Sequence, residues 1–357
     1  MKSALALSTA VLLTALPVYA QEPAPTPAAV DPAADSRTLE QKIPVSVTNT
    51  DQDNILTLNI ENDLFTGGDS NYTSGVRLTY SDLNTTPPEF AYALAGWLPG
   101  FEINDTTSLS FSLGQNIFTP EDIESRAQAQ NEHPWAGFLY ASMAMSTLTD
   151  NHIDQVEATL GVVGPASMAE QSQKFIHRHI SDSPMPKGWS NQLENEPGLM
   201  LAWERTWPQY LSGEIGGLFG SIAPYTGVTV GNIYTFADAG FTVRLGPDSE
   251  KWQDTPIRVR PAMPGTGFFE IPEDNWSWYL FAGAEGRAVA RNIFLDGNTF
   301  RDSYSVDKEY LVGDANAGLA LTYGKTRVSF TWVYRTKEFE QQDKPETFGS
   351  VAIGYRF

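Results

Sequence analysis

Two groups of polar residues in this sequence carry the side chains that metal-assisted hydrolysis requires. His177 is a candidate general base, because an unperturbed histidine has a pKa of about 6.5 and offers a neutral imidazole near pH 7. Gln173 precedes it by four residues, so the two share one face if the segment is helical. Asp63 offers the hard oxygen that cations such as calcium prefer, Asn62 can complete the shell, and Thr73 can donate a hydrogen bond. Attack by an activated water beside a bound cation is one chemistry that side chains of these types can perform.

Each of these residues also has a plainer interpretation. An Asn-Asp pair before a loop is usually a turn former. Gln173 is typical of the polar face of a surface helix. An isolated histidine is more often a solvated loop residue, and this is the interpretation that we give to His133, His152 and His179.

The first twenty residues are typical of a secretory signal peptide, with Lys2, an apolar run over 4–16 and the small residues Val18 and Ala20. The run is too short for a membrane-spanning helix, which needs about 20 apolar residues. Residues 21–50 are rich in Pro, Ala and Asp and predict a flexible periplasmic lead-in. The folded part is therefore expected at 51–357.

The chain is strongly acidic, with 23 Lys and Arg against 43 Asp and Glu and a formal net charge of −20. Removing the signal peptide, which holds one lysine, changes this to about −21. Nucleic acid is not expected as a partner, because binding it requires a cationic surface. The sequence has no cysteine, so a large closed fold must supply the stability that disulfides give to many exported proteins.

From Asn54 onward, short segments alternate between apolar and polar residues, the pattern of strands in a transmembrane barrel. The alternation is clearest over 326–335 and in the last segment, which ends on Phe357. We predict twelve strands near 54–62, 73–82, 106–116, 136–147, 153–163, 197–206, 211–229, 233–245, 276–290, 309–323, 325–336 and 347–357.

These strands predict an all-β fold, a closed antiparallel transmembrane β-barrel. Its polar lumen accounts for a mean hydropathy of −0.27 beside 12% aromatic residues. A soluble β-sandwich is the alternative, and the signal peptide and terminal aromatic residue favour the barrel. With the N-terminus in the periplasm, the segments 63–72, 117–135, 164–196, 291–308 and 337–346 become outer loops. The longest, 164–196, has helical composition from Ser167 to Ile180 and is ended by Pro184.

Several motifs together resemble the lipid A 3′-O-deacylase family of outer-membrane barrels. They are Glu61-Asn62-Asp63-Leu64-Phe65, Asn71-Tyr72-Thr73-Ser74-Gly75-Val76, Gly114-Gln115-Asn116-Ile117-Phe118-Thr119-Pro120, Trp135-Ala136-Gly137, Gly161-Val162-Val163-Gly164-Pro165, His177-Arg178, Trp189 with Gln192 and Glu194, Ala284-Glu285-Gly286-Arg287 and Arg335-Thr336-Lys337-Glu338-Phe339. The resemblance covers nearly all of the chain from residue 54 to 357.

The resemblance implies an enzyme that removes the 3′-linked acyloxyacyl group from lipid A of lipopolysaccharide, with calcium as cofactor. Its catalytic positions fall on His177, Gln173, Asn62 and Thr73, and its metal position falls on Asp63. All five lie in or beside predicted outer loops. We expect direct attack by water rather than an acyl-enzyme, because the sequence lacks a Gly-x-Ser-x-Gly element.

Lipid A carries phosphates, so the acidic chain needs local cations to hold its substrate. Lys174, Arg178 and Arg126 are the predicted substrate-binding residues, with Lys187 as a further candidate. The family has a lysine in the outer loop after the third strand, where this chain has Ser125 and Arg126. This departure leaves a different acyl substrate open.

We expect a monomer in the Gram-negative outer membrane, with the active site facing the cell exterior. Two other functions remain open. An outer-membrane phospholipase would share the barrel and calcium, and a porin or structural barrel would have no catalytic site.

Overall fold

The computed structural model describes residues 54–66, 71–83, 85, 87–96, 101–104, 106–149, 151–181, 183–208, 210–247, 268–272 and 275–357. The predicted signal peptide, 1–20, and lead-in, 21–50, lie outside the described residues. Within these ranges the chain forms thirteen antiparallel strands in one sheet. The strands are β1 (Asn54–Asn62), β2 (Asn71–Asp82), β3 (Ser108–Thr119), β4 (Ala136–Leu148), β5 (Ile153–Val163), β6 (Glu196–Thr206), β7 (Leu211–Ile215), β8 (Leu218–Gly231), β9 (Tyr234–Gly246), β10 (Trp276–Asn292), β11 (Leu311–Tyr323), β12 (Thr326–Arg335) and β13 (Glu346–Arg356).

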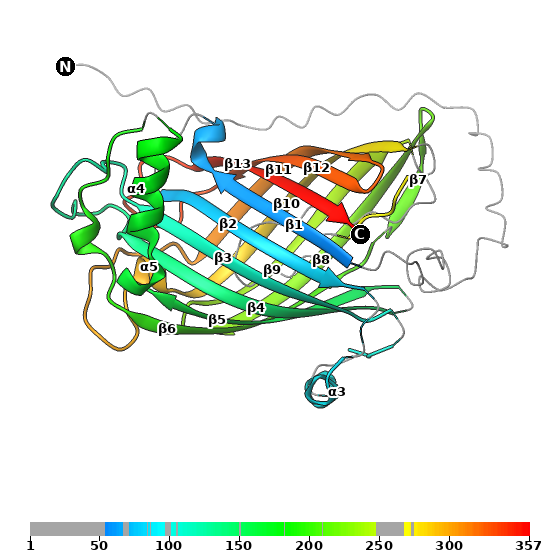
Figure 1. Ribbon diagram of the computed structural model, residues 1–357, viewed down its shortest axis with the longest axis horizontal. Coiled ribbons are helices and arrows are strands. Elements are labelled where there is room, and N and C mark those ends of the chain that lie inside the picture. The colour runs from blue at the N-terminus through cyan, green and yellow to red at the C-terminus, as the bar shows by residue number, and fades with distance from the viewer. Residues whose placement is uncertain are drawn as a thin grey trace, which may run out of the picture. The chain divides into compact units, whose positions relative to one another are not determined.

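Twelve of these strands close into a barrel (Figure 1). Strands that follow each other in sequence pair, except that β6 pairs with β8 and not with β7, and the first strand pairs with the last. The backbones of Asn54 and Phe357 hydrogen-bond to each other, so both ends of the barrel sequence lie at one rim. The prediction of a closed twelve-stranded antiparallel barrel is confirmed.

The prediction of one strand over 211–229 was wrong. Gly216 and Gly217 have φ angles of 62° and 81°, a left-handed conformation that glycine adopts without steric cost. They turn the chain back, so that β7 pairs with the start of β8 and lies outside the closed ring. The Gly216-Gly217 pair is itself a typical hairpin signal, and the prediction of one continuous strand overlooked it.

Alternate residues along the strands face opposite sides of the wall. On β2, for example, Val76, Leu78 and Tyr80 are exposed on the outside. Between them Arg77 points into the lumen, where it pairs with Glu157 at 2.9 Å. Exposed aromatic residues lie on the outer surface near both rims, as in the interfacial girdles of membrane barrels: Trp276, Tyr323, Tyr355 and Phe357 at one rim, and Trp332 and Tyr334 toward the other.

Three α-helices occur in the described part of the chain: α3 (Glu89–Ala95), α4 (Ala169–His179) and α5 (Ile293–Asp296). Single 3-10 turns occur at η1 (Asp63–Thr66), η2 (Pro165–Ser167) and η3 (Trp189–Asn191). Among the described helices, none combines the length and apolar character that crossing a membrane takes. The predicted helix in the long loop is α4, and its place is confirmed.

Apolar clusters lie inside the barrel near both rims. At the rim that carries α4 and α5, Phe294 stacks on Phe118 at 4.1 Å, and both belong to a buried cluster with Phe138 and Phe348. At the opposite rim the side chains of Phe268 and Phe269 lie in a second cluster. The guanidinium groups of Arg327 and Arg356 hold them there, at 2.9 and 3.1 Å from their carbonyl oxygens. Apolar side chains therefore pack inside the barrel near each rim.

Candidate active site

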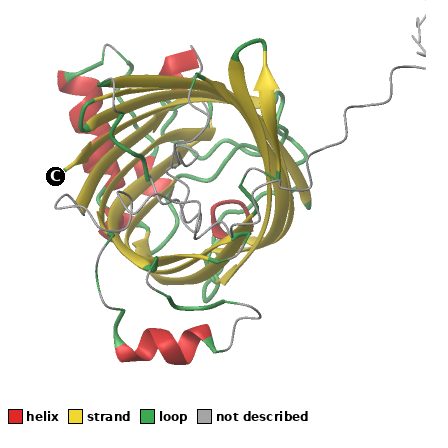
Figure 2. Cartoon of the chain, turned by 90° about the vertical axis from the view of Figure 1, so that its right-hand side faces the viewer, coloured by secondary structure: helices red, strands yellow, loops and turns green. Residues whose placement is uncertain are grey.

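Helix α4 packs on the outside of the barrel wall, over β3 and β4 (Figures 1 and 2). Residues that pair across antiparallel strands point to the same side. Val76 faces outward and pairs with Gln115, which pairs with Leu139. By alternation Ile117 and Gly137 also face outward. The side chains of Ser167 and Ala169 lie against Gly137, where any larger residue would displace them.

An apolar cluster holds the helix and the loop after it against the wall. It comprises Ile117, Ile123, Trp135, Ala169 and Trp189, all buried. The two indole rings are 5.1 Å apart. Backbone hydrogen bonds fasten the loop at two points, from Lys187 to Ile123 and from Leu193 to Trp135, both at 2.9 Å. Residues from two outer loops and one strand therefore fix the position of α4.

Thr73 lies in an irregularity of β2 beside this cluster. The register of β2 with β3 shifts between Tyr72 and Ser74, so Thr73 has no opposite residue. Bulges of this kind re-aim a side chain. The Thr73 hydroxyl shares a 2.7 Å hydrogen bond with that of Thr119, two residues beyond Ile117 on the same face of β3. Thr73 therefore lies on the part of the wall next to α4.

Asn62 and Asp63 lie at the same rim, at the end of β1. Asn62 pairs with Ser74 on one side and Gly349 on the other, so it is adjacent to Thr73. Asp63 begins η1 and is 1% exposed. The pair Asn62 and Asp63 is about 110 residues from Gln173 and His177 of α4 in the sequence. The structure brings both segments to one rim and one side of the barrel.

His177 is half-buried near the end of α4, and the structure fixes its tautomer. Its Nδ1 lies 2.6 Å from the carbonyl oxygen of Pro184. A carbonyl oxygen only accepts hydrogen bonds, so Nδ1 carries the proton. With the proton on Nδ1, the neutral form of the ring has a lone pair on Nε2, the arrangement that a general base needs.

Gln173 lies one turn earlier on α4 and is 2% exposed. The indole Nε1 of Trp189 donates to its Oε1 at 2.7 Å. Its Nε2 donates no hydrogen bond within the described ranges. The amide is thus held at its oxygen end, with two N–H donors left over.

The predicted phosphate-binding cations are less closely grouped. Lys174 pairs with Glu170 on its own helix. Arg178 and Arg126 are exposed, and the carbonyl oxygen of Arg126 accepts from Asn191 in the loop after α4. No hydrogen bond joins His177 to Thr73 in the described part of the chain. The assigned roles of all these residues stay predictions.

Asp63 is the residue predicted to hold calcium, and its side chain is buried. Glu346, the first residue of β13, is buried and accepts from the backbone N–H of Tyr72 at 2.6 Å. Glu346 pairs across the sheet with Arg335, which binds Asp314 inside the barrel, so the Glu346 side chain faces the lumen. No group of three or more His, Cys, Asp or Glu gathers as a metal centre among the described residues. The buried carboxylate of Asp63, with the Asn62 amide oxygen, backbone oxygens and water, fits a hard cation such as calcium.

The interpretation of His133 as a solvated residue was wrong. The ring is 4% exposed and stacks on Phe118 with centroids 5.4 Å apart. Burial lowers its pKa below the ordinary value, although the contact with the Pro134 carbonyl opposes this. His152 is also partly buried, between Thr149 and Asp154. His179 is exposed as predicted.

Sequence reasoning assigned no role to Thr119 or Glu346. Thr119 closes the motif Gly114–Pro120, but nothing local marks it as the neighbour of Thr73. Glu346 was placed in an outer loop and lies 283 residues after Asp63 (346 − 63). Only closure of the barrel brings β13 beside β1.

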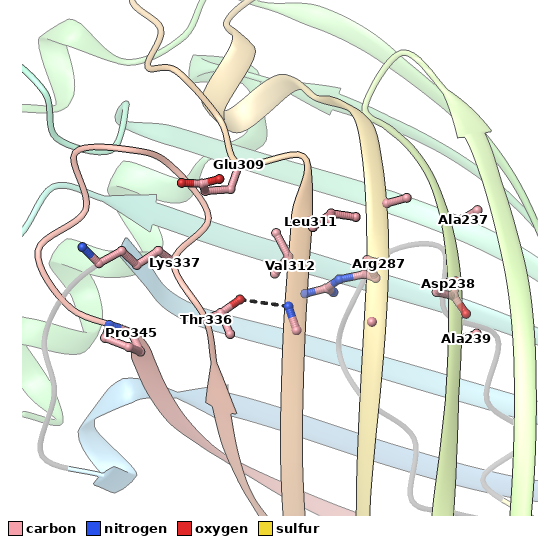
Figure 3. A pocket seen from close by; sticks show the side chains of 13 residues that line it. Ala237, Asp238, Ala239, Arg287, Glu309, Leu311, Val312, Thr336, Lys337 and Pro345 are labelled. Atoms are coloured by element: carbon pink, nitrogen blue, oxygen red, sulfur yellow. Dashed lines mark hydrogen bonds between the residues drawn. The ribbon is translucent and has the colours of Figure 1, made fainter. Parts of the chain in front are cut away.

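A hollow of about 840 Å³ lies elsewhere on the wall, over β9 to β11 (Figure 3). Small outward residues line it, including Ala237, Ala239, Gly286 and Ala288. Thr336 at its edge accepts a 2.9 Å hydrogen bond from the backbone of Gly313. None of the candidate catalytic residues lines this hollow, so its size says nothing about the chemistry beside α4.

Comparison with known proteins identifies the family. The family described as "Outer membrane protein LpxR" matches residues 5–357. The chain belongs to this family. It is the family that the sequence motifs resemble, so the predicted enzyme class, an outer-membrane lipid A deacylase, is confirmed at this level. A search of curated proteins gives no match.

Solved structures agree on the fold. LpxR from Salmonella typhimurium is 21% identical, with a TM-score of 0.68, and the alignment covers 85% of this chain and all of that one. The β domain of the Bordetella autotransporter BrkA is 9% identical, covering 85% and 98% of the two chains, with a TM-score of 0.39. The translocator domain of NalP from Neisseria meningitidis is 10% identical, covering 88% and 92%, with a TM-score of 0.33. Only the first similarity is close enough to support the architecture.

Proposed function

We propose that this LpxR-family protein hydrolyses the ester that links the 3′ acyloxyacyl group to lipid A, in the space between α4 and the barrel wall. The placement of α4 on the outside of the wall carries the proposal. A site between that helix and the outward face of β3 opens toward the surrounding lipid, so a lipid substrate reaches it from within the membrane. A site in the lumen would lie behind the wall.

In this mechanism Nε2 of His177 takes a proton from water, while Nδ1–H remains on the Pro184 carbonyl. The oxygen of that water forms a bond to the ester carbonyl carbon. Collapse of the tetrahedral intermediate breaks the bond to the sugar oxygen. The proton on His177 then passes to that oxygen. The products are the acyloxyacyl group as a free carboxylic acid and lipid A with a free 3′ hydroxyl.

Thr73 serves better as a hydrogen-bond donor than as a nucleophile. Its hydroxyl is hydrogen-bonded to Thr119, not to a base that would remove its proton. Direct attack by water therefore requires fewer assumptions than an acyl-enzyme.

Calcium would be held by the buried carboxylate of Asp63, and the amide oxygen of the adjacent Asn62 could join its shell. When bound, it supplies Lewis-acid polarisation of the ester carbonyl. The phosphates of lipid A would lie near Arg178 and Arg126, which are exposed and belong to α4 and the loop tied to it.

We place the α4 rim at the cell exterior, because both ends of the barrel sequence lie at the opposite rim and an exported chain starts from the periplasm. All candidate residues come from one chain, so a monomer suffices. Protease cleavage at a site inserted near Ala127, tested on whole cells, checks this orientation. Cleavage only after cell lysis contradicts it.

Mass spectrometry of lipid A from cells with and without the protein tests the activity. Loss of one 3′ acyloxyacyl unit, absent with His177→Ala, is the expected result. Unchanged lipid A with a rise in lysophospholipid would identify a phospholipase instead. No lipid change, with the barrel correctly inserted, rules out both hydrolases.

A further inference from the structure

We infer that Trp189 positions Gln173 so that the amide offers N–H donors, and not its carbonyl oxygen, to the substrate ester. The inference rests on the proposed hydrolysis and deepens it. It decides between two roles for Gln173, an acceptor that orients the attacking water or a donor that stabilises the developing oxyanion. Trp189 is a positioning residue in this account, since it acts through Gln173.

The chemistry of the indole ring fixes which end of the amide it meets. An indole nitrogen donates and never accepts. The contact of 2.7 Å between Trp189 Nε1 and Gln173 must therefore use the amide oxygen. Both side chains are 2% exposed, so water does not compete well for this hydrogen bond. With the oxygen engaged, the NH₂ group is the end that remains available.

The indole ring itself cannot readily follow a rotating amide. It packs in the buried cluster with Ile117, Trp135 and Ala169. Its neighbour Gly188 lies so close to the Trp135 ring that a Cβ there would be 2.6 Å from the indole. Interiors this densely packed resist side-chain rotation. Trp189 thus acts as a fixed reference for the Gln173 amide.

The free end of the amide needs an acceptor. Gln173 Nε2 is buried and donates no hydrogen bond within the described ranges. A buried N–H without a partner is costly. An ester carbonyl supplies an acceptor whose negative charge grows as the water attacks, so this hydrogen bond strengthens in the transition state. His177 lies one turn along the same helix, where its Nε2 can activate that water.

A double-mutant cycle on the full-length barrel in detergent tests the coupling. Trp189→Phe keeps an aromatic ring but removes the N–H, and we expect kcat to fall about tenfold with little change in KM. Gln173→Ala should lower kcat by about 100-fold, as expected for loss of an oxyanion donor. In the Gln173→Ala background, Trp189→Phe should have no further effect. Independent, multiplicative losses would overturn the inference.

Two further variants separate the donor role from packing. Gln173→Glu still accepts from Trp189 but presents an oxygen to the substrate, so it should be no more active than Gln173→Ala. Substantial activity in Gln173→Glu contradicts a donor role. Trp135→Phe removes an indole N–H from the same cluster that donates no hydrogen bond to described residues, so it is the matched control and should keep most of the wild-type kcat.

A measurement without substrate distinguishes failure of the inference from failure of the proposed function. In spectra of ¹⁵N-labelled tryptophan, the Trp189 indole signal should move on Gln173→Ala, while the Trp135 signal stays. A Trp189 signal that does not move overturns the inference by itself. Wild-type protein that leaves lipid A intact, while the signal moves, overturns the proposed function and with it the role of Gln173.

Discussion

Gly137→Ala tests whether the position of α4 against the barrel wall determines the rate of hydrolysis. Gly137 is an outward position on β4, and a Cβ there would overlap the Cβ of Ala169 and the Oγ of Ser167. The strand is held on both sides by the barrel ladder. The start of α4 therefore has to move, while the barrel strands keep their positions.

The size of the effect follows from this overlap. Carbon atoms in contact prefer a separation of about 3.5 to 4 Å, so the start of α4 must move outward by more than about 1 Å. A misplacement of about 1 Å can cost about 100-fold in rate, or about 2.7 kcal/mol of activation free energy. Gln173 and His177 move with the helix, away from Thr73 and Asp63. We expect kcat to fall by about this factor.

The assay is release of fatty acid from purified lipid A by protein in detergent, with barrel folding checked by heat-dependent gel mobility. Gly286→Ala is the matched control. Gly286 is likewise an outward strand glycine, but a Cβ there meets nothing within 4 Å. The control should keep wild-type kcat and mobility. A fully active Gly137→Ala with normal mobility would refute the claim that α4 must rest against β4 for hydrolysis.

Three other perturbations have definite outcomes. His177→Ala should lower kcat by about 10²- to 10⁴-fold, because the general base is lost. His179→Ala changes an exposed position of the same helix and should leave kcat unchanged. Equal losses in the two variants would contradict the role of His177 as the base. Asp63→Asn should weaken calcium binding in a calorimetric titration, and a chelator should abolish activity; full activity in chelator contradicts a calcium enzyme. Burial lowers the pKa of His133 in the folded protein. The neutral His133 side chain therefore stabilises the folded state at pH values above its unfolded-state pKa of about 6.5. This stabilisation is lost as pH falls through the lower pKa of the folded state. Wild-type thermal stability should therefore fall more steeply below pH 6 than that of His133→Phe, and parallel curves would contradict this.

Much of the fold follows from local pattern. The alternation over 326–335 predicts β12 with its outward aromatic residues, and the structure shows that strand. The helical composition after Ser167 predicts α4, and Pro184 lies beyond its end. The hairpin at Gly216 was missed, although the pair Gly216-Gly217 between two strand-like runs is a local signal for such a turn.

The sequence by itself determined the family, the number of strands in the wall and the types of side chain available for hydrolysis, since alternation and motifs are local properties of the chain. Only the tertiary structure decided that α4 rests on the lipid-facing side of the wall, that His177 carries its proton on Nδ1, and that Trp189 holds the oxygen of Gln173. These three features depend on contacts between residues that are distant in sequence. Ser167 and Ala169 contact Gly137, about 30 residues away. Glu346 likewise accepts a hydrogen bond from Tyr72 across the closed barrel. Such contacts arise because the sheet closes, and no local pattern encodes which distant residues the closure brings together.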